Sequence, residues 1–131
     1  MVVRLPKVCL ERTLFHLRGV MPHEGVGLWL GRAGWVLEVW PLPNIHLRPW
    51  EGYLAEGYSL IQALRHGERS GLELVAIFHS HPRGPAQPSE TDRAQAFWRV
   101  PYVIFDMRTE HLRAFRLPQG EEVPVWFERL S

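Results

Sequence analysis

The 131-residue chain carries 15 basic and 14 acidic side chains, a formal net charge of +1, and 46% of its residues are hydrophobic. Because the basic residues are scattered, the chain lacks the electrostatic footprint of a protein that binds nucleic acid or an anionic membrane. Its length and composition predict one globular domain that spans residues 1–131.

Cysteine content and hydropathy bear on the compartment. Cys9 is the only cysteine in the sequence, so an intrachain disulfide and a cysteine-based zinc cluster are both excluded, and a reducing compartment fits. The first ten residues lack the apolar core of a secretory signal, and no stretch approaches the roughly 20 apolar residues of a membrane span. We therefore expect a cytoplasmic protein. Six tryptophans in so short a chain are candidate anchors for a partner or a homodimer contact.

The first half of the chain predicts a helix, a hairpin and a second helix. Apolar side chains recur every three or four positions over residues 10–21, which predicts an amphipathic helix. Two β-prone runs, 26–30 and 35–40, flank a glycine-containing turn and predict a β-hairpin. The proline-rich segment 41–49 remains unassigned. Helical spacing returns over residues 54–69, which predicts the second helix.

The second half begins with a dense apolar run over residues 72–78, which has strand length and predicts a central strand. Pro88-Ser-Glu-Thr-Asp92 opens a helix that we expect to extend to about Trp98. Further strands are expected over 102–105, 112–117 and 123–127. Helices that alternate with both hairpin and crossover strands indicate one α/β domain with a mixed β-sheet flanked by helices.

Two histidines follow the central strand directly. His79 and His81 are two residues apart, so on a strand their imidazoles point to the same face. Asp92 lies thirteen residues after His79, in the first turn of the next helix, where the intervening loop can fold it back toward the strand end. Two histidines and a carboxylate are the three ligands of a catalytic zinc site, which keeps a fourth position for water. The pattern predicts a metal-dependent hydrolase.

Each of these residues also has a structural interpretation. Histidine pairs with this spacing arise by chance. Ser89 and Asp92 are spaced as in a capping box, in which both residues satisfy amides at a helix start. Glu24 is the candidate acid/base, but taken alone it is an acidic residue in a turn rich in proline and glycine. The individual residues therefore leave the choice between structure and catalysis open.

The joint pattern of Glu24, His79-x-His81, seven residues, Ser89, two residues and Asp92 resembles the JAMM motif of the MPN-domain (Mov34/PAD-1) zinc metalloproteases, in their compact prokaryotic form. Pro22-His-Glu-Gly25 and Phe78-His-Ser-His-Pro82 resemble the segments around that motif. The resemblance covers practically the whole chain. It departs from the family pattern where Gly25-Val26 replaces a cysteine that often follows the glutamate.

This resemblance implies a cytidine-deaminase-like architecture and a Zn²⁺ ion held by His79, His81 and Asp92. Glu24 would activate the water as acid/base, and Ser89 would help to stabilise the oxyanion. The expected reaction is hydrolysis of isopeptide or peptide bonds at the C-terminus of a ubiquitin-like or sulfur-carrier protein that ends in a Gly-Gly tail. The group released is either a protein or a single amino acid.

Three other functions compete with this one. Many MPN domains are non-catalytic scaffolds, but those typically lack ligands that are all present here. A non-haem iron oxygenase also uses two histidines and a carboxylate, although in a different order along the chain. RadC-like proteins share a similar core, and Ser80 between the histidines and the lack of an N-terminal helical DNA-binding module argue against them.

Overall fold

The computed structural model describes residues 1–128, so the last three residues of the expected domain lie outside the described part. The helices are α1 (Lys7–Val20), α2 (Gly57–Arg69) and α3 (Glu90–Ala94). The strands are β1 (Val3–Pro6), β2 (Val26–Arg32), β3 (Trp35–Leu42), β4 (Glu73–His81), β5 (Tyr102–Asp106), β6 (His111–Arg116), β7 (Glu121–Val123) and β8 (Val125–Glu128).

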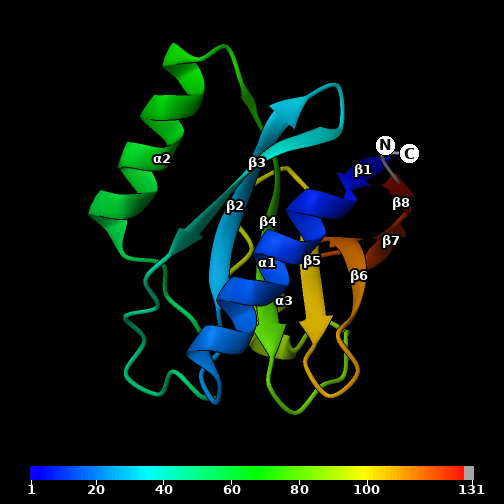
Figure 1. Cartoon of the computed structure of the whole chain (residues 1–131). Helices are drawn as coiled ribbons and strands as arrows, with labels where there is room; N and C mark the ends of the chain where they lie inside the picture. The colour runs from blue at the N-terminus through cyan, green and yellow to red at the C-terminus, as the bar shows by residue number, and fades with distance from the viewer. Residues whose placement is uncertain (129–131) are drawn as a thin grey trace.

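All these strands belong to one sheet, in the order β7-β6-β5-β4-β2-β3-β1-β8 (Figure 1). Strand β4 pairs parallel with β5 and antiparallel with β2, so the sheet is mixed, as predicted. The strands at the two ends of this order, β7 and β8, are separated in the chain by Pro124 alone. The sheet therefore curls back on itself.

Each face of the sheet buries its own apolar layer. On one face Leu14 and Leu17 of α1 pack with Trp29 and Phe78, and Figure 1 shows α1 crossing this face. On the other face Ala63 of α2 packs in a second cluster with apolar side chains of β2, β4 and β5. The alternation of side chains along each strand sorts them into these two layers. The α/β class predicted from the sequence is confirmed.

Strand β4 was predicted as central, and it lies between β5 and β2. Its residue Ile77 belongs to the apolar layer on the α2 face, whereas the neighbouring Phe78 belongs to the layer on the α1 face. From Ile77 to His81 the odd positions of β4 therefore face α2, whereas a register shift against β2 places Val75 in the layer on the α1 face. This alternation directs the two predicted histidines toward the α2 face, at the carboxyl end of the central strand.

The prediction and the structure differ in three places. β1 was not predicted, because four residues are too short to show a period. The single strand expected over 123–127 is two strands that lie at opposite edges of the sheet and are interrupted at Pro124. The helix expected to reach Trp98 ends at Ala94, and the backbone amides of Phe97 and Trp98 donate to the Tyr102 hydroxyl instead of continuing the helix.

The remaining elements match the predicted ones to within a few residues. Helices α1 and α2 and the β2–β3 hairpin lie where the sequence predicted them. Within residues 1–128, the helices are all too short or too polar to cross a membrane.

Candidate metal centre

Two imidazoles and a carboxylate meet at the carboxyl end of β4. The Nε2 atoms of His79 and His81 lie 3.2 Å apart, which confirms that the two side chains share a face of the strand. Asp92 of α3 lies against both of them, with Oδ1 3.2 Å from Nε2 of His79 and Oδ2 3.1 Å from Nε2 of His81. His79 is fully buried and Asp92 is 7% exposed. The structure thus brings the three predicted ligands together.

The start of α3 explains how Asp92 is aimed. Ser89 is the N-cap, and its hydroxyl accepts a hydrogen bond from the Asp92 amide at 3.0 Å. In return, Oδ2 of Asp92 accepts from the Ser89 amide at 2.9 Å, which completes a capping box. The capping interpretation is therefore correct, but it does not exclude the other one, because the same carboxylate contacts both histidines. Capping fixes the direction in which the carboxylate points.

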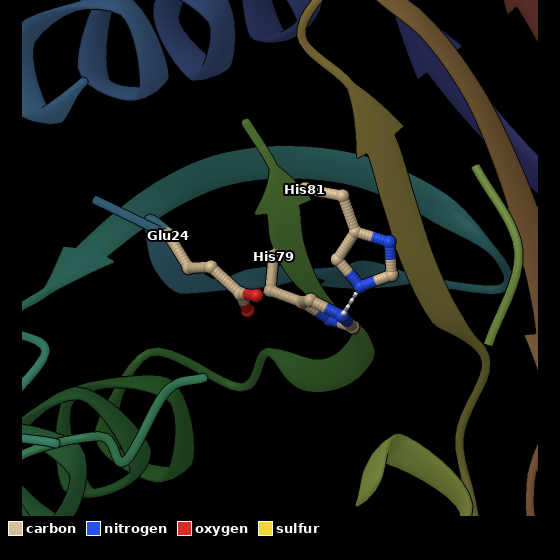
Figure 2. Close-up of side chains that lie close together, drawn as sticks. All are labelled: Glu24, His79 and His81. Atoms are coloured by element: carbon tan, nitrogen blue, oxygen red, sulfur yellow. Dashed lines mark hydrogen bonds between the residues drawn. The ribbon is translucent and has the colours of Figure 1, made fainter. Parts of the chain in front are cut away.

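Glu24 reaches the cluster through the pairing of β2 with β4. The Ser80 amide donates to the Gly25 carbonyl at 3.0 Å, and the Gly25 amide donates to Oγ of Ser80 at 2.8 Å. These bonds hold the residue after Glu24 against the strand between the two histidines. The Glu24 carboxylate and ligand atoms of His79 and His81 all lie within 4.8 Å of one another, and Figure 2 shows the three side chains converging.

Burial sets the protonation of these groups. Loss of solvent raises the pKa of Glu24 to about 7, and this effect outweighs the opposing charge of His81. Burial lowers the pKa of His79 and favours its neutral, lone-pair form. Burial also opposes ionisation of Asp92, but hydrogen bonds from His79 and His81 hold the pKa of that carboxyl well below its usual range. Glu24 is thus poised to exchange a proton near neutral pH.

The hydrogen-bonding pattern provides a test of whether these residues suit a metal ion. Nδ1 of His81 lies 2.8 Å from the Pro85 carbonyl oxygen, which can only accept, so Nδ1 carries the hydrogen. The Nε2 lone pair of a neutral His81 therefore faces the carboxylate of Asp92 and Nε2 of His79. Electron pairs that converge in this way need a cation between them, which is either a proton on an imidazole, as in the hydrogen bonds to Asp92, or a metal ion. The raised pKa of His81, for which hydrogen bonding to Asp92 overcomes burial, has the same origin.

The distances also fit a metal ion. Zinc bonds of about 2.0–2.2 Å to nitrogen and oxygen place tetrahedral neighbours roughly 3.3–3.6 Å apart, so ligands near the lower end of this range need to move only slightly. The separations between Nε2 of His79 and its neighbours in His81 and Asp92 are both 3.2 Å. A carbonyl bonded to the far nitrogen of a ligating histidine, as Pro85 is to His81, is the usual support for such a ligand.

A cleft of about 790 Å³ opens beside this cluster. Glu24, His81 and Ser89 line it, together with Trp50 and Arg83 from the surrounding loops. The hydroxyl oxygen of Ser89 accepts a hydrogen bond from the Asp92 amide. The hydroxyl hydrogen remains available to donate to a group in the cleft. A substrate in this cleft therefore has access to the predicted base, to one predicted ligand and to a hydroxyl donor.

Sequence reasoning did not find two residues at this site. Ser80, which is fully buried, holds Gly25 through the two hydrogen bonds described above. The ring of Tyr53 stacks on the His79 imidazole with ring centroids 4.5 Å apart. Tyr53 follows the unassigned proline-rich segment, where no periodicity indicates its position. Ser80 was visible as the residue between the histidines, but only the pairing of β2 with β4 reveals its partner.

A mixed α/β sheet with two histidines and two carboxylates at the end of its central strand defines the class of metalloprotease-like α/β proteins. The chain belongs to the prokaryotic homologs of the JAB domain, whose family model matches residues 6–118. The resemblance to the compact prokaryotic JAMM/MPN family is thereby confirmed.

The chain is similar to two named enzymes. A probable TtuB-protein conjugate cleaving protease of Thermus thermophilus is 53% identical over 125 residues, which cover 95% of this chain and 82% of the relative. A desampylase of Haloferax volcanii is 32% identical over 82 residues, which cover 61% of this chain and 59% of the relative. The chain thus spans most of the first relative and less than two thirds of the second.

Solved structures give the same fold. A protein of Desulfitobacterium hafniense superposes with a TM-score of 0.88 at 28% identity, over 99% of this chain and 94% of the other. A JAB1/MPN domain protein of Archaeoglobus fulgidus superposes with a TM-score of 0.64 at 18% identity, over 96% of each chain. The second similarity concerns the fold alone, and it supports the JAB1/MPN assignment of the architecture.

Proposed function

We propose that this chain is a zinc-dependent isopeptidase that cleaves the amide bond after the C-terminus of a ubiquitin-like or sulfur-carrier protein. Similarity to a probable conjugate-cleaving protease and to a desampylase supports a hydrolase of the isopeptidase type. The observation that carries the metal assignment is the convergence of His79, His81 and Asp92, whose electron pairs face one another at 3.1–3.2 Å. Of the candidate roles, a catalytic zinc site accounts best for this arrangement.

In this proposal His79, His81 and Asp92 are the zinc ligands. A zinc ion held there supplies Lewis acidity for water and for the substrate carbonyl. Glu24 takes a proton from the attacking water at its carboxylate and returns it to the leaving amine nitrogen. Burial raises the pKa of this carboxyl, to about 7 in the site without a metal ion, which favours the return of the proton to the amine. The Ser89 hydroxyl donates to the oxygen that becomes negatively charged in the transition state.

The proposed substrate carries a Gly-Gly tail that enters the cleft in an extended conformation. The relatives named for cleaving TtuB-protein conjugates and as a desampylase support a conjugate of a ubiquitin-like protein. Glu24, His81 and Ser89 line the same cleft, so one extended chain can reach all three. Glycines next to the scissile bond carry no side chains to obstruct that approach. Whether the released amine belongs to a protein lysine or to a single amino acid is decided by experiment.

The test measures metal content and cleavage on the same preparations. The substrate is a ubiquitin-like protein whose C-terminal Gly-Gly is joined to the lysine side chain of a fluorescent peptide; a second substrate carries a single cysteine instead. Purified protein should hold about one zinc per chain, as three protein ligands require. Chelation should abolish cleavage, and added zinc should restore it. Full activity in metal-free protein would refute the mechanism.

Variants separate the ligands from the base. Glu24→Gln should retain zinc and lose roughly 10²- to 10⁴-fold in kcat, because a positioned acid/base contributes about that much. Asp92→Ala should lose zinc as well as activity. Glu11→Gln is the matched control, because Glu11 lies on an exposed part of α1 and pairs only with Lys7 among the described residues. Equal zinc loss in Glu24→Gln and Asp92→Ala would make Glu24 a ligand instead of the base.

A further inference from the structure

The backbone of Glu24 is held by the segment 43–56, which connects β3 with α2. The Glu24 amide donates to the Pro49 carbonyl at 2.7 Å, and the Glu24 carbonyl accepts from Nδ2 of Asn44 at 2.9 Å. Both hydrogen-bonding groups of the Glu24 backbone are therefore bonded to this one segment. The position of Glu24 depends on how firmly the segment is held.

Asn44 holds the segment by using its whole side-chain amide. Besides the Glu24 carbonyl, Nδ2 donates to the Gly52 carbonyl at 3.0 Å. Oδ1 accepts from the amides of His46 and Leu54, both at 3.0 Å. A primary amide offers two donor hydrogens and an oxygen with two lone pairs, and all four are used here. Asn44, the only asparagine of the sequence, closes the segment on itself and ties it to Glu24.

The neighbouring residue is held from the opposite side. Gly25 bonds through both its amide and its carbonyl to Ser80, between the two histidines. The same segment that contains Asn44 also places the Tyr53 ring on the His79 imidazole. The segment therefore contacts both Glu24, the predicted base, and His79, a predicted ligand. It links the position of Glu24 to that of His79.

The Glu24 carboxylate depends on this backbone support. Its Oε1 atom is buried and has no hydrogen-bond partner among residues 1–128. Because no hydrogen bond fixes this oxygen, its position depends on the packing around the side chain and on the backbone that carries it. We propose that Asn44 is a positioning residue that fixes Glu24 relative to His79 and His81, an inference that rests on the function proposed above.

Two substitutions at Asn44 separate its donors from its acceptors. Asn44→Ala removes all four hydrogen bonds. Asn44→Asp keeps the two acceptor bonds within the segment, but it cannot donate to the Glu24 carbonyl or to the Gly52 carbonyl of the segment itself. His46→Ala is the matched control, because the His46 ring accepts a hydrogen bond from the Arg48 amide within the same segment, and among the described residues it forms no hydrogen bond with Glu24.

Cleavage of the Gly-Gly-linked lysine peptide is then measured over the full pH range, with zinc content determined for each variant. Both Asn44 variants should lose roughly 10- to 100-fold in the plateau value of kcat, because small displacements of a reacting group have effects of this size. KM and zinc content should stay at the wild-type values, as should all parameters of His46→Ala. Wild-type kcat in Asn44→Asp, which has lost the donor bond to the Glu24 carbonyl, would overturn the inference.

A second measurement does not depend on activity. The Glu24 amide should exchange its hydrogen faster in Asn44→Ala and Asn44→Asp than in the wild type, and at the wild-type rate in His46→Ala, as followed by NMR. Unchanged exchange in both Asn44 variants would overturn the inference. If the wild type cleaves neither conjugate, the proposed substrate is wrong, and the exchange rates still decide whether Asn44 holds Glu24.

Discussion

Removal of the Ser80 hydroxyl tests how the chain next to Glu24 is joined to the strand that carries His79 and His81. Oγ of Ser80 accepts the Gly25 amide at 2.8 Å, and Ser80 is fully buried. In Ser80→Ala that amide loses its acceptor in a place that water does not reach. A buried donor without a partner costs about 1–3 kcal/mol of unfolding free energy. For a domain of this length this corresponds to a decrease in Tm of roughly 4–10 °C.

The same substitution should lower activity. Ser80→Ala frees the Gly25 amide from its hydrogen bond, and Glu24 is the residue directly before Gly25. We therefore expect kcat to decrease roughly tenfold or more, while zinc content stays at one per chain. The assays are thermal unfolding followed by circular dichroism, cleavage of the Gly-Gly conjugate and zinc analysis. Ser70→Ala is the control, because Ser70 is exposed at the end of α2, and its Tm should stay close to the wild-type value. Wild-type Tm and kcat in Ser80→Ala would refute the reasoning.

Three further experiments test the packing of the core and of the sheet. Thr13→Val should lower the free energy of unfolding by about 1–3 kcal/mol, because the indole N–H of Trp29 loses its buried acceptor; Thr13→Ser keeps the hydroxyl and should lose less, as denaturant titration will measure. Cys9 is 3% exposed and burial raises its pKa, so a thiol reagent at pH 8 should label native protein far more slowly than urea-unfolded protein. Gly27→Ala would press a methyl group against the Phe78 ring and place it 2.6 Å from the Trp40 carbonyl oxygen, so it should lower Tm, whereas an unchanged Tm would mean that both neighbours move aside easily.

The elements that sequence predicts well here are those with a local period. Helix α1 and the strand β4 are long enough for a period of three to four residues or an unbroken apolar run to appear. β1 has four residues and pairs in parallel with β8 from the far end of the chain, so neither its length nor its neighbours reveal it. The curl of the sheet at Pro124 depends on the same distant pairing.

The residues of the site also divide into those that a local pattern predicts and those that depend on tertiary contacts. His79 and His81 follow from strand geometry, because side chains two apart share a face. Glu24 depends on the alignment of Val26 with His79 across β2 and β4, which no local pattern encodes, and only the family motif singled it out. Tyr53 and Asn44 lie in the segment between β3 and α2, where the chain has little regular structure. Their contributions come from tertiary contacts alone.

Asp92 shows why a structural interpretation and a chemical one need not compete. An ionised carboxylate has two oxygens and about four lone-pair sites, which is enough for several partners at once. Oδ2 accepts the Ser89 amide that starts α3 and also faces His81, while Oδ1 faces His79. An asparagine has one acceptor oxygen, so it can complete the cap but cannot offer an acceptor oxygen to each imidazole. The helix start requires only one acceptor at this position, whereas an oxygen for each of the two histidines requires a carboxylate.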